Sequence, residues 1–291
     1  MEKETIKLAV NGTVVDLPNS WDTIDDKDFP VIVDALAQLY AGIITPNEVL
    51  CRYVCSALSL SLPRIVSSNH AADLLAIAQR VTFLFTPSAP VLAASAASLQ
   101  LQPNLNFARQ FLPRIATHNA YTISTSCQRL TCSLTALQYI EAIDALHGGT
   151  DQLPLLASIL YSPHPYDTAK ALDLVGEFRC QPAVTLLSVR MVFEALVNFI
   201  YTRTPFSLLA RFKPKKESPI ATTMADSLFD LATEGYGTVD QVEQMNVITF
   251  LSIMRKKTID TVRSMRSMEL TTPDIASRTG LPLSVINDIV Q

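Results

Sequence analysis

Apolar residues recur at helical spacing along most of the chain, and the first clear example lies near the start. Phe29, Ile32, Val33 and Leu36 fall on one face of a helix, which predicts an amphipathic helix that begins at Asp26 or Asp28 and ends at Gly42. The run Thr45-Pro46-Asn47-Glu48 has the form of a capping box with proline at the first helical position. It predicts a second helix as far as Pro63, so that the two form a helical hairpin.

The residues before these helices alternate in a different way. Two short β-prone runs, between Thr5 and Leu17, flank Asn11-Gly12. Asn-Gly is a strong signal for a hairpin turn because both residues accept a positive φ. The sequence therefore predicts a small β-hairpin.

The rest of the chain is predicted to consist mainly of further helices. The expected helices cover residues 71–84 with Ser68 or Asn69 as cap, 133–146 with a stop at Gly148-Gly149, 153–161, 169–178 with Asp167 as cap, 182–201, 224–233, 240–266, and a helical hairpin in the last 20 residues. Residues 81–103 are nearly uncharged and interrupted by prolines, so buried connectors and a short Ala-rich helix are expected there. Residues 121–130 are expected to be either a loop or a short strand.

Together these elements predict a mainly α fold, with a helical bundle-like domain, a small N-terminal β-hairpin and a C-terminal helical hairpin. The predicted division is a hairpin at 1–20, a main helical domain at 21–212 with its core in 131–212, a linker at 213–219 and a C-terminal helical region at 220–291. The linker is predicted because its residues are charged, flanked by prolines and without apolar anchors.

The composition is rich in apolar residues and has no excess of positive charge. Hydrophobic residues make up 48% of the 291 residues against 17% charged, so we expect a partner to cover part of the apolar surface. The formal net charge is −4, which argues against recruitment of nucleic acid or of an anionic membrane.

Residues 183–201 have the length of a membrane span. However, Arg190, Glu194 and Asn198 recur every four residues and form one polar stripe on an otherwise apolar helix. Charges at the middle of a bilayer are costly, so we expect a buried helix and no membrane. Pairs such as Arg190 and Glu194 more often fix the register of packed helices than perform chemistry.

Cysteines and histidines form no recognisable site. The five cysteines are an odd number, and Met1-Glu2-Lys3-Glu4 does not lead into a secretory signal, which predicts a reducing compartment and free, largely buried thiols. Cys51 and Cys55 are four apart on a predicted helix but lack a histidine at ligand spacing, and Cys127 and Cys132 are likewise alone.

The histidines, His70, His118, His147 and His164, are scattered, and His147 is expected to complement a helix end. No phosphate-binding glycine loop, catalytic serine motif or zinc motif occurs. We therefore expect no catalytic residue, no cofactor and no metal.

The final segment resembles a helix-turn-helix, with Ala276 inside the first helix, Gly280 at the turn and Ile286 packing back. Basic residues precede it, namely Arg255, Lys256, Lys257, Arg263 and Arg266. Its second helix offers Ser284, Asn287 and the acidic Asp288, which is unfavourable near phosphates. A docking hairpin is the leading interpretation and a DNA-binding regulator the alternative.

Four stretches carry a family resemblance: residues 10–22, 134–142, 156–161 and 193–199. In this order they resemble proteins from structural gene clusters of tailed phages and prophages of Bacteroides-type bacteria. Residues 275–282 also resemble the closing segment of some tail assembly chaperones. The resemblance implies a non-enzymatic virion or assembly protein, either a neck or tail component or a tail assembly chaperone. Its expected partners are other phage structural proteins and copies of itself, in the virion or the host cytoplasm.

An enzyme with a dispersed site is a third hypothesis.

Overall fold

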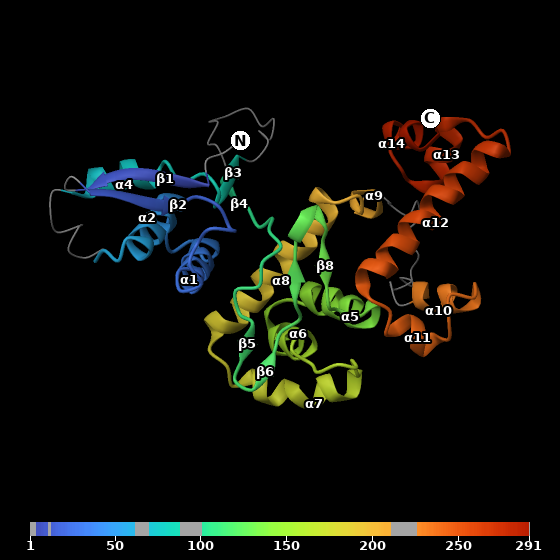
Figure 1. Cartoon of the computed structure of the whole chain (residues 1–291), viewed down its shortest axis with the longest axis horizontal. Helices are drawn as coiled ribbons and strands as arrows, with labels where there is room; N and C mark the ends of the chain where they lie inside the picture. The colour runs from blue at the N-terminus through green and yellow to red at the C-terminus, as the bar shows by residue number, and fades with distance from the viewer. Residues whose placement is uncertain (1–3, 11–12, 62–69, 88–100, 211–225, 291) are drawn as a thin grey trace. The chain divides into compact units, whose positions relative to one another are not determined.

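Figure 1 shows the computed structural model of the chain, which describes all residues except 1–3, 11–12, 62–69, 88–100, 211–225 and 291. The described part is mainly α-helical with a few two-stranded sheets, which confirms the predicted fold class. It forms two compact units, Met1–Leu112 with Gln181–Val192 and Pro113–Cys180 with Phe193–Gln291. This grouping differs from the predicted division. The predicted linker at 213–219 lies outside the described residues.

The described part of the first unit contains the N-terminal hairpin, three complete helices, the first part of α8 and a second two-stranded sheet. Its elements are β1 (Thr5–Val10), β2 (Thr13–Pro18), α1 (Phe29–Tyr40), α2 (Pro46–Ala57), α4 (Ala71–Ala78), β3 (Phe85–Pro87) and β4 (Leu101–Pro103). Strands β1 and β2 pair antiparallel with Ile6 opposite Leu17, and both side chains are buried. The β-hairpin is thus confirmed, while its Asn-Gly turn lies outside the described residues.

The starts of α1 and α2 follow the sequence signals. In α2 the Thr45 hydroxyl accepts from the backbone N–H of Glu48, and the Glu48 carboxylate accepts from the backbone N–H of Thr45, so the capping box is confirmed. Asp28 precedes α1 but does not cap it with its side chain. Its buried carboxylate instead accepts a hydrogen bond from the Ser56 hydroxyl, which joins α1 to α2.

The third predicted helix, 71–84, is shorter than expected, since α4 ends at Ala78. The reason is a long-range contact: the Thr82 backbone N–H donates to the Asn19 side chain (2.9 Å), and the Asn19 amide donates back to the Thr82 hydroxyl (3.1 Å). An N–H that bonds outside the helix cannot continue its ladder. The residues after α4 therefore run as buried connectors, as expected, and then form β3. The expected Ser68 or Asn69 cap lies outside the described residues, as does most of the segment expected to hold the Ala-rich helix.

Aromatic side chains fill the centre of the first unit. Trp21 contacts Phe29, Phe83, Phe107 and Phe111, all buried. Its indole N–H donates to the Asn104 carbonyl at 2.8 Å, so the buried polar atom is satisfied. The sequence predicted the core of the fold within residues 131–212. The aromatic core of the first unit is instead formed by residues that precede this range.

The second unit begins with short strands and continues with helices. Its elements before the gap at 211–225 are β5 (Arg114–Ile115), β6 (His118–Asn119), β7 (Ile123–Ser124), the 3₁₀ turn η1 (Ser126–Gln128), β8 (Thr131–Cys132), α5 (Ala136–His147), the 3₁₀ turn η2 (Thr150–Gln152), α6 (Leu153–Leu160), α7 (Thr168–Arg179) and α9 (Ser207–Ala210). Helix α8 (Ala183–Arg203) has residues in both units. After the gap follow α10 (Asp226–Thr233), α11 (Val239–Glu243), α12 (Val247–Ser267), α13 (Thr272–Thr279) and α14 (Leu283–Val290). The predicted helices at 133–146, 153–161, 169–178 and 182–201 correspond to α5 to α8 and are confirmed.

The long helix predicted over 240–266 is instead two helices, α11 and α12, with a break between them. The backbone at the break pairs with the residues that lead into α5: the Ala136 N–H donates to the Met245 carbonyl, and the Val247 N–H to the Leu134 carbonyl. The Asn246 amide also donates to the Cys132 carbonyl at 2.6 Å. These bonds use backbone groups, the Met245 carbonyl and the Val247 N–H, that would pair within the helix if it were continuous.

Helix α8 is the one helix among the described residues that is long and apolar enough to cross a membrane. Half of its most apolar window is buried inside the protein, including Phe193 and Leu196. Arg190 and Glu194 are half-buried and Asn198 is exposed. The polar stripe thus lies on the more accessible side of a helix whose other side contributes to the core.

All five cysteines are free, but they differ in burial. Cys55 and Cys132 are buried, Cys51 is half-buried, and Cys127 and Cys180 are exposed. The expectation of largely buried thiols is therefore wrong for the last two. Burial raises the pKa of the Cys132 thiol to about 12, which keeps it protonated near neutral pH.

This difference predicts the order of thiol reactivity. With a chromogenic disulfide reagent at neutral pH, Cys127 and Cys180 should react first because they are exposed, whereas Cys55 and Cys132 should react only with unfolding. Replacing both exposed residues by serine should abolish the fast phase and leave the slow one. Equal rates for all thiols in native buffer would contradict the structure.

Candidate functional site

The last three helices of the second unit form a compact group. Val262 of α12, Ile275 of α13, Leu281 and Ile286 are all buried against one another, and Met265 and Leu270 pack on them. Gly280 ends α13 with a φ of +71°, a left-handed conformation that favours glycine and turns the chain toward α14. The predicted C-terminal helical hairpin is confirmed, and it packs on α12.

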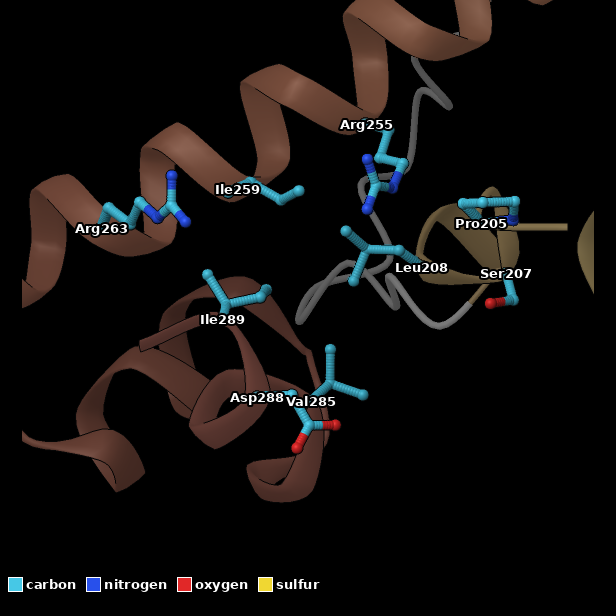
Figure 2. A pocket seen from close by; sticks show the side chains of 9 residues that line it. All are labelled: Pro205, Ser207, Leu208, Arg255, Ile259, Arg263, Val285, Asp288 and Ile289. Atoms are coloured by element: carbon cyan, nitrogen blue, oxygen red, sulfur yellow. The ribbon is translucent and has the colours of Figure 1, made fainter. Parts of the chain in front are cut away.

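A cavity of about 340 Å³ lies between α9, α12 and α14. Figure 2 shows its two kinds of lining: Leu208, Ile259, Val285 and Ile289 are apolar, whereas Arg255, Arg263 and Asp288 are charged. The two arginines lie on α12 on either side of Ile259, and Asp288 comes from α14 (Figure 2).

The electrostatic character of this cavity is positive. Arg255 is half-buried, and its Nε is buried without a hydrogen-bond partner among the described residues. A buried donor without an acceptor is costly, so an acceptor supplied from outside would stabilise it. The only hydroxyl in the described lining is that of Ser207, with no histidine or thiol beside it. The arrangement is suited to binding an apolar segment that carries carboxylates.

The basic residues singled out from the sequence are used in different ways. Lys257 forms an ion pair with Glu234 at 2.5 Å, and Arg266 donates to the Leu270 carbonyl at 3.2 Å beyond the end of α12. Arg255, which is half-buried, and Arg263, which is exposed, line the cavity, whereas Lys256 is exposed and lies outside the cavity lining. These cations therefore do not form one uniform surface for phosphates.

The structure brings together two histidines that sequence spacing kept apart. His118 and His164 line a second cavity, of about 330 Å³, and His118 is paired with Glu177 at 3.0 Å. No sequence signal could have found this, because His118 lies on β6 and His164 lies in the segment after α6. His147 is the last residue of α5, as expected for a helix end. Among the described residues, no group of three His, Cys, Asp or Glu side chains could hold a metal.

Glu141 is the centre of a further polar cluster in the second unit. Its carboxylate accepts from the hydroxyl of the buried Tyr166 and from that of Thr168 at 2.7 Å. Burial, with Asp240 and Glu141 nearby, raises the pKa of the Glu243 carboxyl. Because Tyr166 and Thr168 flank the start of α7, this cluster joins α7 to α5 and has a structural role.

The chain matches no family model, no curated protein and no solved structure. The geometry of its own side chains is what supports a function.

Proposed function

We propose that this chain is a non-enzymatic structural or assembly protein of a phage particle that acts through protein–protein contacts. The particle class, a neck or tail component or a tail assembly chaperone, is based on the sequence resemblance. The mode of action is based on one observation, the cavity between α9, α12 and α14, with apolar walls and two arginines. The partners are other particle proteins and copies of the same chain, in the virion or the host cytoplasm.

Charge and shape both support docking at this cavity. Arginine forms bidentate bonds with carboxylates, and it is enriched in protein interfaces together with apolar anchors. A chain with a formal net charge of −4 has carboxylates to offer a second copy of itself. Exposed large apolar side chains near the same helices, Met268 (70% exposed) and Leu283 (51% exposed), add apolar surface for a partner to cover.

The test is self-association of the full chain by sedimentation velocity over a range of concentrations. The wild type should associate, and the charge reversal Arg263→Glu should weaken association about tenfold or more, since it replaces an attractive charge by a repulsive one. Lys256→Glu is the matched control, because it reverses an exposed charge on the same helix outside the cavity. It should have little effect.

Two outcomes would count against the proposal. One is a wild-type chain that stays monomeric at high concentration and is not recovered with particle proteins. The other is an equal effect of the two charge reversals, which would assign the association to overall charge.

A DNA-binding regulator is the second candidate, favoured by the packing of α13 and α14 on α12, which resembles a helix-turn-helix. Ser284 and Asn287 are exposed on α14, where a recognition helix would present them. Asp288 on the same helix and the structural use of Lys257 and Arg266 argue against it. This candidate requires duplex binding that weakens with salt and with Lys256→Ala plus Arg263→Ala. Absence of any gel shift at low salt would exclude it.

A further inference from the structure

The cavity of about 330 Å³ in the second unit has a polar lining that the proposed function does not use. It is formed by the β5–β6 hairpin and the residues after it, by α5, and by the segment after α6. Its polar and aromatic lining residues include His118, Tyr121, Gln138, Tyr161, Ser162 and His164. Its size is at the lower end of the range typical of small-molecule sites.

Ser162 is the residue that points to a ligand. Ser162 is only 6% exposed, and its hydroxyl has no hydrogen-bond partner among the described residues. Buried hydroxyls in native proteins are almost always hydrogen-bonded, so an unpartnered one that lines a cavity indicates a missing polar group.

The neighbours of Ser162 are held in place by the protein. Gln138 is fully buried, and its amide donates to the Ile159 carbonyl at 2.7 Å. His118 is held by its hydrogen bond to Glu177 at 3.0 Å. A site with side chains fixed in advance binds without the entropic cost of ordering them.

The lining holds no aspartate or glutamate. It contains no lysine or arginine, and burial raises the pKa of the Tyr161 hydroxyl, which therefore stays protonated. Phosphates and carboxylates are usually bound by cations, so an anion is disfavoured here. Hydroxyl, amide and imidazole groups beside aromatic rings suit a ligand with polar edges and apolar faces.

We propose that this cavity binds a small neutral molecule rich in hydroxyl groups, of about the size of a monosaccharide, and that Ser162 donates to or accepts from one of its hydroxyls. This inference is independent of the proposed function, because it concerns different residues and a different class of partner.

Ligand-observed saturation-transfer NMR on the full chain tests this directly, with D-glucose and N-acetyl-D-glucosamine as probes. At least one sugar should give saturable transfer. Ser162→Ala should weaken its affinity about 2- to 10-fold, the effect of one neutral hydrogen bond. Ser188→Ala is the matched control: Ser188 is also buried without a hydrogen-bond partner among the described residues, but it does not line this cavity. It should leave the affinity unchanged.

A second variant and a second probe complete the experiment. Ser162→Leu should abolish binding by filling the cavity, with a circular dichroism spectrum like that of the wild type. Lack of saturable transfer from either sugar would overturn the proposal. So would saturable binding of inorganic phosphate without sugar binding, or equal weakening by the Ser162→Ala and Ser188→Ala variants.

Discussion

Arg109→Ala should lower the free energy of unfolding by about 1.5–3 kcal/mol, because its charge-assisted hydrogen bonds join distant parts of the first unit. The guanidinium donates to the carbonyls of Trp21 (3.1 Å), Asp22 (3.0 Å) and Ile24 (2.8 Å), and to the Asp26 carboxylate at 2.7 Å. It also lies over the ring of Phe111, 4.5 Å from its centroid. Removal leaves partly buried carbonyls without their donor.

Urea denaturation followed by circular dichroism measures this effect. Arg109→Lys should recover only part of the loss, since an ammonium group cannot reproduce the fork of the guanidinium. Arg80→Ala removes a cation from an exposed position and should change stability by less than about 0.5 kcal/mol. A loss below about 1 kcal/mol for Arg109→Ala would show that water replaces these bonds at little cost.

Ile286→Ala should destabilise the C-terminal helices by about 2–5 kcal/mol, since it removes a fully buried side chain from a small cluster. The Ile286 side chain packs in one buried cluster with Val262, Ile275 and Leu281. No disulfide supports this cluster, because all five cysteines are free. We expect α13 and α14 to lose their packing on α12 before the rest of the unit unfolds.

Hydrogen exchange of the backbone amides in 272–290 reports this local loss. Protection there should fall in Ile286→Ala, while amides in α5 and α6 keep theirs. Leu283→Ala is the matched control, because this leucine lies on the same helix but is 51% exposed. Similar loss of protection in the two variants would contradict the assignment of Ile286 to the core of this group.

Local signals in the sequence predicted most helix boundaries. The capping box of Thr45 and Glu48 and the glycine turn at Gly280 depend on residues within a few positions, so the sequence contains all that they require. The end of α4 was mispredicted because the Asn19 side chain, 63 residues away, takes the Thr82 N–H. Periodicity identifies an apolar face but not the partner that covers it.

The candidate sites show the same limit. The C-terminal hairpin was predicted, since its turn and apolar positions are adjacent in sequence. Its cavity could not be, because Leu208 of α9 faces Ile289 of α14 only in the folded chain (Figure 2). The unpartnered hydroxyl of Ser162 likewise has no sequence signal, because an unmade hydrogen bond is a property of the packed structure.

The Asn246 bond to the Cys132 carbonyl joins positions 114 residues apart. Closing so long a stretch of chain carries an entropic cost that nearby contacts do not, so contacts within the α5–α7 segment can form first at lower cost. The packing of α12 and of the C-terminal helical hairpin then depends on the Asn246–Cys132 contact, which we expect to form late in folding. Binding at the C-terminal cavity would therefore depend on how stable this Asn246 contact is as well as on the affinity of the cavity itself.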